Sequence, residues 1–342
     1  MPSAAVLEPS PSAGDLHKVK IIEHPAPALK ANQALVRMNS VALNHREFWI
    51  LKGLYPGQQF GSVLGADGVG HITQLNGPSS RLKVNDRVVV MPSIGWYNDV
   101  RGPEKESEYS IIGGTAAEGT FTEQFVGEQD NLFKAPEYLT DIEAAALPLA
   151  GLTAYRALFT KGLVTKGQNV LITGIGGGVA LLALQFAHAV GANVFVTSSD
   201  EVKIQKAIEL GAKGGMNYKK ADWPEKLLEA TNGELIDVVI DGASGPDGAT
   251  ILTRLLRAGG IFVNYGITAG DLDWSITAIL RNVELKASTM GSRKEFEALL
   301  EFVTKYQIRP VVSEVFQGLQ KTREAIDVLQ TGSQFGKVVI TL

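Results

Sequence analysis

The sequence predicts an α/β protein with two domains, one mostly β and the other built on a doubly wound parallel sheet. Three observations carry this prediction. Residues 1–140 contain short β-branched runs cut by glycine, proline and asparagine, a pattern typical of β structure. From about residue 150, strand-like and helix-like segments alternate, which indicates a parallel sheet with helices on both faces. At 342 residues, the chain is long enough for two hydrophobic cores.

The individual elements follow from the spacing of apolar residues. The helix expected after the first strand of the second part has Val179, Leu182 and Phe186 on one face, and Gly191 is a natural end for it. Strands are predicted at 33–43, 70–75, 86–92 and 121–126, and then at 169–173, 193–198, 237–242 and 261–266. Helices are predicted at 178–191, 200–211, 248–260, 293–308 and 318–332, before a last strand at 337–342.

The composition favours a small-molecule partner. A formal charge of -4 supplies no basic surface, so neither nucleic acid nor a membrane is an expected partner. No apolar run reaches the roughly 20 residues of a membrane span, and the first residues do not resemble a signal peptide, so we expect a cytoplasmic protein. The chain has no cysteine, which excludes disulfides, thiolate nucleophiles and every cysteine-containing zinc site.

The segment LITGIGGGVA (171–180) joins a predicted strand to a predicted helix. A glycine-rich turn at this place lets backbone amides approach a diphosphate, which the helix dipole also stabilises. The spacing fits GxxGxxA, with Ala180 small enough for close packing of helix on strand. The alternative is a tight turn without a ligand. The residues predicted to cradle the phosphates are Gly174, Gly176, Gly177, Gly178 and Val179.

The end of the next predicted strand bears on the choice of dinucleotide. An acidic residue there would accept hydrogen bonds from the adenosine ribose and repel an added phosphate. This strand ends in Thr197, Ser198 and Ser199, whose hydroxyl side chains carry no charge. Asp200 follows, but its place beside Glu201 at the start of a predicted helix is typical of acids that complement the helix dipole. With Lys203 downstream, the pattern favours NADPH over NADH; the alternative for Lys203 is a solvated helix residue.

Several motifs then occur in one order along nearly the whole chain: ALNHREFWILKGLYP (42–56), GSVLGADGVGHI (61–72), VNDRVVV (84–90), ALPLAGLTAYRAL (146–158), the glycine loop, GAKGGMNYKKADW (211–223) and GKVVITL (336–342). Together they resemble the medium-chain dehydrogenase/reductase superfamily, and within it the zinc-independent quinone oxidoreductase and enoyl reductase branch. The resemblance implies a GroES-like catalytic domain from residues 1–140 and 292–342, and a Rossmann NADPH-binding domain from residues 141–291.

The resemblance also bears on zinc. Asn44 and the run Gly65-Ala66-Asp67 stand where zinc-containing relatives have a cysteine and a Gly-His-Glu. Neither replaces thiolate and imidazole, so we expect no metal site and no alcohol oxidation by the zinc mechanism. The segment 94–118 stands where those relatives have a structural-zinc lobe; its Trp96 and Tyr97 either anchor the lobe or line the cleft.

The resemblance further implies a set of cofactor contacts. Ser198, Lys203 and Tyr218 match 2'-phosphate positions, and for Tyr218 a strand-end packing role is the alternative. Lys337 matches a C-terminal basic residue that reaches the cofactor. The remaining expected contacts are His45, Thr153, Asp241 and Gly266.

The expected reaction is hydride transfer from NADPH to an activated C=C bond (an α,β-unsaturated carbonyl) or a quinone. Tyr55 matches a tyrosine of the quinone and enoyl reductases that is a proposed proton donor in the latter, and a packing role is the alternative. The side-chain amide of Asn44 is a candidate hydrogen-bond donor to the substrate carbonyl or to the cofactor. The positive charge of Arg46 serves phosphate, a substrate carboxylate, or the acids Glu47 and Asp67; the sequence does not decide among these three roles.

Two other functions stay open at this stage: a carbonyl reductase on the same scaffold, and a non-catalytic NADPH-binding protein. The run VELKASTM (283–290) resembles the edge strand through which family members pair, so a homodimer is expected.

Overall fold

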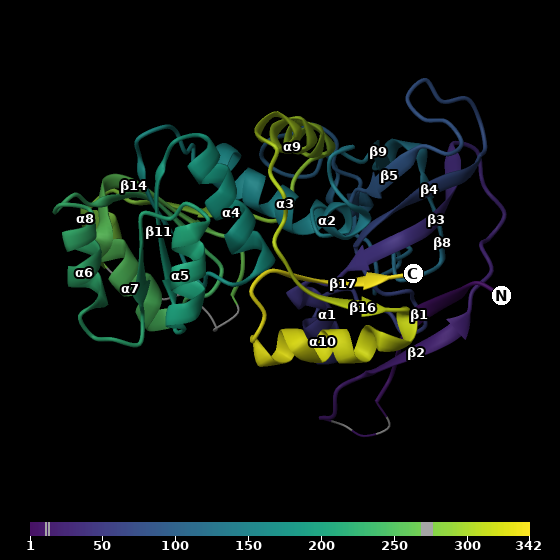
Figure 1. Cartoon of the computed structure of the whole chain (residues 1–342), viewed down its shortest axis with the longest axis horizontal. Helices are drawn as coiled ribbons and strands as arrows, with labels where there is room; N and C mark the ends of the chain where they lie inside the picture. Colours follow the sequence, from purple (N-terminus) through teal and green to yellow (C-terminus); the bar gives the residue numbers. More distant parts are fainter. Residues whose placement is uncertain (11, 13, 268–275) are drawn as a thin grey trace. The chain divides into compact units, whose positions relative to one another are not determined.

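The computed structural model describes residues 1–10, 12, 14–267 and 276–342, and it forms two compact units (Figure 1). Unit 1 consists of Met1–Ala150 and Ser292–Leu342, and unit 2 of Gly151–Gly291. The division falls inside helix α3 (Pro148–Tyr155), whereas the sequence placed it at residue 140. Among the described residues, no helix is both long enough and apolar enough to cross a membrane.

Unit 1 is mostly β, as predicted. Its main sheet has the order β16-β17-β3-β4-β5-β9, with β8 also paired to β3. The last strand of the chain pairs antiparallel with β3, matching Val339 with Ala42, so residues at the two ends of the chain become neighbours. The strands are β1 (Ser3–Glu8), β2 (Lys18–Glu23), β3 (Gln33–Ala42), β4 (Asp67–Leu75), β5 (Arg87–Val90), β6 (Ser93–Ile94), β7 (Ser110–Ile111), β8 (Gln124–Glu128), β9 (Leu132–Lys134), β16 (Val312–Gln317) and β17 (Lys337–Thr341).

The helices of unit 1 include the two predicted in the tail. Helix α9 (Arg293–Tyr306) begins at a capping box in which Ser292 and Glu295 satisfy each other's backbone amides, and it buries Phe296, Leu299 and Val303 on one face. The others are α1 (His45–Leu51), α2 (Asp141–Ala145) and α10 (Thr322–Thr331).

Unit 2 is a doubly wound parallel sheet with the order β12-β11-β10-β13-β14-β15. Counted in chain order this is 3-2-1-4-5-6, and the order reverses beside β10, where such folds bind ligands. The strands are β10 (Asn169–Ile172), β11 (Asn193–Ser198), β12 (Gly214–Asn217), β13 (Ile236–Asp241), β14 (Leu256–Asn264) and β15 (Glu284–Ala287). The helices are α4 (Gly178–Ala189), α5 (Glu201–Glu209), α6 (Trp223–Ala230), α7 (Pro246–Leu255) and α8 (Ile276–Leu280).

Candidate active site

The glycine loop joins β10 to α4 at the point where the strand order reverses. Gly174 and Gly176 have backbone φ values of 62° and 139°, which residues other than glycine rarely adopt. A Cβ on Gly174 would lie 2.4 Å from the Cβ of Ala243, whereas one on Gly177 would meet nothing within 4 Å. Gly177 therefore borders open space at the start of α4, where the first amides of the helix and its dipole favour an anion.

Asp241 pins together the strand ends beside this loop. Its buried carboxylate accepts hydrogen bonds from the Thr173 hydroxyl (2.5 Å), the Asn264 side-chain amide (2.9 Å) and both the backbone amide (3.1 Å) and hydroxyl of Ser244. The amide of Asn264 also donates to the backbone carbonyl of Gly266 (2.9 Å). Asp241 thus holds the carboxyl ends of β10, β13 and β14 in place, and the predicted cofactor contacts of Asp241 and Gly266 stay predictions.

The end of β11 brings together two of the three predicted 2'-phosphate residues, Ser198 and Tyr218. The Tyr218 amide donates to the Ser198 carbonyl (3.1 Å), because β12 runs parallel beside β11. The Tyr218 side chain is exposed, and Ser198 is buried with its hydroxyl accepting from the Asp200 amide (3.1 Å). Lys203 lies on the first turn of α5, where burial lowers the pKa of its ammonium.

Asp200 caps α5, as the sequence suggested. Its carboxylate accepts from the Val202 amide at 2.8 Å. The Asp200 carboxylate therefore has a structural role, as the hydrogen-bond acceptor at the start of α5.

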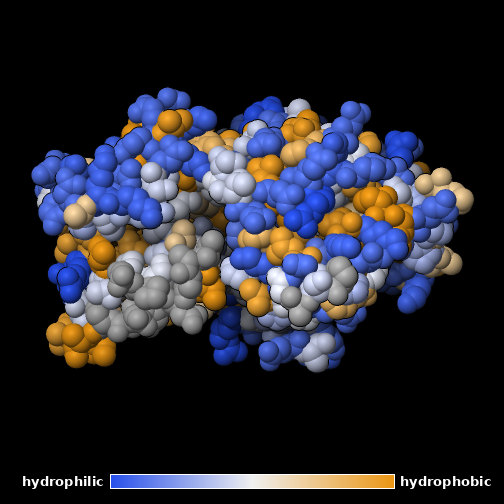
Figure 2. All heavy atoms as spheres, turned by 90° about the horizontal axis from the view of Figure 1, so that it is seen from below, coloured by the Kyte–Doolittle hydropathy of each residue, from blue (hydrophilic) through white to orange (hydrophobic). Residues whose placement is uncertain are grey.

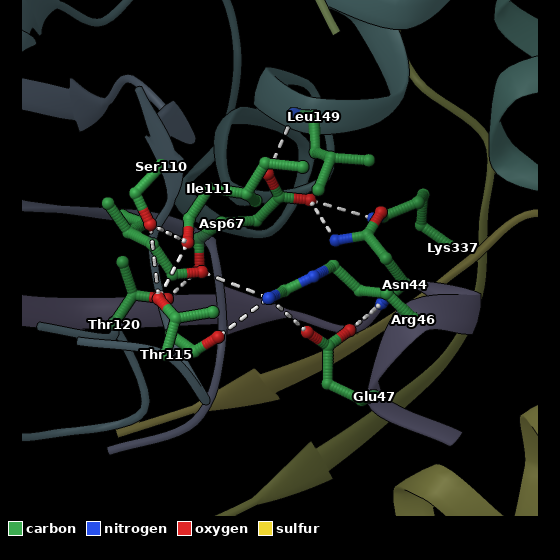
Figure 3. Close-up of polar contacts among 12 residues, drawn as sticks. Asn44, Arg46, Glu47, Asp67, Ser110, Ile111, Thr115, Thr120, Leu149 and Lys337 are labelled. Atoms are coloured by element: carbon green, nitrogen blue, oxygen red, sulfur yellow. Dashed lines mark hydrogen bonds and ion pairs between the residues drawn. The ribbon is translucent and has the colours of Figure 1, made fainter. Parts of the chain in front are cut away.

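In unit 1, Asn44, Asp67 and Lys337 form a buried cluster (Figure 3). The Lys337 ammonium donates to Asn44 Oδ1 (2.5 Å) and to Asp67 Oδ2 (2.8 Å). Asn44 Nδ2 donates to the same Asp67 oxygen (2.9 Å), and the other carboxylate oxygen accepts from the Leu149 amide (2.7 Å). Exposure is 0% for Asp67, 4% for Lys337 and 8% for Asn44, so this charge pair is almost free of water.

The sequence did not predict this arrangement for Lys337. It placed Lys337 at the cofactor, but pairing of β17 with β3 brings its side chain to Asn44 and Asp67. Contact of Lys337 with a cofactor stays a prediction. Only the long-range pairing of the last strand with β3 could have revealed these partners.

A second charged pair adjoins the cluster at the start of α1. The Glu47 carboxylate accepts from the Asn44 backbone amide (2.7 Å) and from Arg46 Nη1 (3.0 Å). Burial raises the pKa of Glu47, and the charge of Arg46 and the bond from Asn44 partly offset this. From the sequence, Glu47 was one of two acids considered as partners of Arg46, and that pairing is confirmed. Its second role, at the start of α1, was not predicted; its place three residues after Asn44, typical of a capping box, is the signal that was available.

Tyr55 lies against Arg46, whose guanidinium carbon is 4.6 Å from the centre of the tyrosine ring. His45 lies edge-on to Phe48 (5.8 Å between ring centres) and Trp49 (6.1 Å). Burial, aided by the charge of Lys52, lowers the pKa of His45, so its imidazole is neutral at neutral pH. In unit 2, the Thr153 hydroxyl lies 3.9 Å from the sulfur of Met290.

The lobe formed by residues 94–118 is organised by a carboxylate. Glu104 accepts hydrogen bonds from the backbone amides of Tyr97 (2.9 Å), Asn98 (2.6 Å) and Asp99 (3.1 Å). Trp96 is buried, donates to the Asp99 carbonyl (2.7 Å) and packs edge-on against Tyr109, so it anchors the lobe. Tyr97 is exposed.

Glu104→Gln is expected to loosen the lobe without unfolding the protein. The backbone amides hold the pKa of Glu104 at about 2, below its ordinary value. Because the pKa of Glu104 is lower in the folded protein than in the unfolded chain, where it is roughly 4.3, its ionised carboxylate stabilises the fold. This stabilisation is fully present above the unfolded-state pKa and is lost as the pH falls through the folded-state pKa. Hydrogen exchange at neutral pH should therefore be faster at residues 97–99 in the variant. The exposed Glu106→Gln is the control, and equal exchange in the two variants would contradict this role.

Comparisons with known proteins agree with this architecture. Residues 30–137 match the alcohol dehydrogenase GroES-like domain, and residues 178–305 match the family described as zinc-binding dehydrogenase. The zinc-type alcohol dehydrogenase-like protein YogA of Leptosphaeria maculans is 39% identical, with 100% of both chains covered. The zinc-type alcohol dehydrogenase-like protein C1773.06c of Schizosaccharomyces pombe is 34% identical over 92% of each chain. A solved NAD-dependent alcohol dehydrogenase has a TM-score of 0.89 and 29% identity, with 100% of both chains covered.

Proposed function

Because this chain belongs to the medium-chain dehydrogenase/reductase superfamily, we propose that it is a zinc-independent, NADPH-dependent reductase. It is an oxidoreductase of that superfamily with a nicotinamide cofactor. The proposed acceptor is the activated C=C bond of an α,β-unsaturated carbonyl compound, or a quinone. The observation that carries the proposal is the Asn44–Asp67–Lys337 cluster.

Zinc, which the family description implies, does not fit this cluster. Asn44 Oδ1 and Asp67 Oδ2 both accept from the Lys337 ammonium, so a divalent cation bound by them would lie against a buried positive charge. Zinc prefers thiolate and imidazole donors, and the chain has no cysteine. Within the described part of the chain, no group of three His, Cys, Asp or Glu side chains could hold a metal. The proposed reaction therefore has no metal-dependent step.

The residues present do fit a nicotinamide dinucleotide. The open space at Gly177 and the amides at the start of α4 suit the diphosphate. When bound, the cofactor supplies hydride. The residues at the end of β11 favour the 2'-phosphate form, because Ser198 and Tyr218 lie together there and the Asp200 carboxylate is engaged with the Val202 amide.

Lys203→Ala tests this cofactor choice. We expect the variant to bind NADPH about 10-fold more weakly, the loss of one charge-assisted hydrogen bond of roughly 1.5 kcal/mol, and to bind NADH as the parent does. Binding is followed by fluorescence titration of each dinucleotide. Lys206→Ala on the exposed part of α5 is the control. Equal weakening toward both dinucleotides would remove the phosphate role.

In the proposed reaction, Asn44 and Tyr55 act on the acceptor. Lys337 holds Asn44 Oδ1 and Asp67 holds one amide hydrogen, so the second amide hydrogen of Asn44 stays available for a carbonyl oxygen. Hydrogen bonding there stabilises the enolate that forms when hydride adds to the β-carbon. The Tyr55 phenol then supplies the proton that completes reduction of the C=C bond.

A carbonyl reductase is the second candidate, favoured by the alcohol dehydrogenase names of the relatives. The products separate the two: an enone gives a saturated ketone in the first case and an allylic alcohol in the second. No NADPH oxidation with enones, quinones or aldehydes would instead support a non-catalytic NADPH-binding protein.

We also propose that the protein is a homodimer formed through β15. This strand lies at the edge of the unit 2 sheet and exposes Leu285, and the nearby α8 exposes Ile279 and Leu280. Figure 2 shows hydrophobic side chains on the surface at the end of unit 2 where α8 lies. Sedimentation of the parent as a monomer would contradict this.

A further inference from the structure

Arg46 lies against Tyr55, the residue that supplies the proton in the proposed function. The inference drawn from this contact rests on that proposed function. Arg46 follows β3 at the start of α1, and its side chain is buried with an exposure of 7% for the residue. From the sequence, its charge was open to phosphate, to a substrate carboxylate or to the acids Glu47 and Asp67. The structure shows its partners to be one carboxylate, two backbone carbonyls and one aromatic ring.

Three hydrogen bonds hold the two terminal nitrogens of the Arg46 guanidinium. Nη1 donates to Glu47 Oε1 (3.0 Å) and to the carbonyl of Ile112 (3.0 Å), and Nη2 donates to the carbonyl of Gly113 (2.6 Å). The guanidinium carbon lies 4.6 Å from the centre of the Tyr55 ring. A planar group held at both terminal nitrogens has one orientation, so the ring against it rests on a rigid surface.

The carbonyls that hold Arg46 are themselves rigid. Gly113 has a φ of 78°, and a Cβ there would lie 1.9 Å from the carbonyl oxygen of Gly65. The next residue, Gly114, donates to the Val63 carbonyl (2.8 Å) and accepts from the Gln59 amide (2.9 Å). Residues 112–114 of the lobe are thus packed against the segment 59–65 that follows Tyr55.

We propose that Arg46 is the positioning residue for Tyr55, and that it is locked in place by the carbonyls of Ile112 and Gly113. The lobe then has a function in the reaction: its end fixes the guanidinium on which the proton-donating phenol rests. Glu47 neutralises the arginine charge on the other side. Arg46 itself touches neither substrate nor cofactor in this proposal.

Arg46→Lys is the main test, since a lysine keeps the charge beside Glu47 but lacks the planar fork. With NADPH and an enone, we expect kcat to fall about 10-fold, a cost of roughly 1.4 kcal/mol, while the KM for NADPH is unchanged. In a Tyr55→Phe background the same substitution should leave kcat unchanged. Equal losses of kcat in the two backgrounds, or no loss in the parent, would overturn the proposal.

A matched control is available in the same unit. Arg81 also lies over an aromatic ring, 5.4 Å from the centre of Phe133, and also donates to a backbone carbonyl, that of Gln129. Arg81→Lys is expected to have the parent kcat in both backgrounds.

Fluorine NMR of protein carrying fluorotyrosine gives a readout that does not depend on activity. The Tyr55 resonance is assigned by its absence in Tyr55→Phe. It should shift and broaden in Arg46→Lys and not in Arg81→Lys; an unchanged resonance would overturn the positioning role. If the parent reduced no acceptor but the resonance moved as expected, the proposed function would fail and the positioning of Tyr55 would stand. An Arg46→Met, Glu47→Gln variant, which removes both charges together, serves if Arg46→Lys does not fold.

Discussion

Lys337→Met is expected to lower the free energy of unfolding by about 3–5 kcal/mol, the cost typical of breaking a buried ion pair on one side. The Asp67 carboxylate has an exposure of 0% and would lose its cation, and Asn44 Oδ1 would lose its donor. Urea unfolding of the parent and the variant measures the difference.

Two further variants test whether the loss of the buried ion pair is what destabilises Lys337→Met. Removing both charges together, in Lys337→Met with Asp67→Asn, should recover much of the loss, because no uncompensated charge stays buried. Lys20→Met removes an exposed lysine whose ammonium lies 2.6 Å from Glu8, and it should cost about 0–1 kcal/mol. A loss for Lys337→Met no larger than that for Lys20→Met would contradict the buried pair.

Tyr55→Phe is expected to lower kcat by about 100-fold, the lower range for loss of a general acid, with little change in the KM for NADPH. The phenylalanine keeps the ring against Arg46 but has no proton to give. The solvent deuterium isotope effect on kcat should change together with the rate, because proton transfer from the phenol is removed. Steady-state kinetics with an enone in water and in deuterium oxide test both expectations.

Tyr306→Phe is the matched control for this variant. Its ring lies at the end of α9, packed against Phe302, and it is partly exposed. The parent kcat is expected for Tyr306→Phe. If Tyr55→Phe also has the parent kcat, Tyr55 is a packing residue.

The fold was predictable because its signals are local. Alternation of strand and helix patterns after residue 150 is sufficient for a parallel sheet, and the order 3-2-1-4-5-6 is one of the few that such a pattern allows. The place of Asp200 at the start of a helix followed in the same way from the helical pattern after it, and it is confirmed; the structure adds the cap hydrogen bond from the Val202 amide. Each of these inferences uses residues close together in the chain.

The candidate site was only partly predictable because its contacts are long-range. Lys337 meets Asn44 through pairing of the last strand with β3, and nothing in the local pattern of GKVVITL indicates that partner. Arg46 reaches carbonyls of the lobe that lie 66 and 67 residues further along the chain. The saturation of Asp241 by hydrogen bonds depends likewise on three strand ends meeting. Residue type suggested chemistry at these positions, but the partners decide which chemistry each side chain is available for.

Reduction of an enone by protein treated with a metal chelator tests the central claim most directly. NADPH carrying deuterium at the transferred position is supplied, and the product is identified by mass spectrometry and NMR. A zinc-independent enoyl reductase gives the saturated ketone with deuterium on the β-carbon, at the same rate before and after chelation. An allylic alcohol as product, or turnover that is lost on chelation and restored by zinc, would contradict the account.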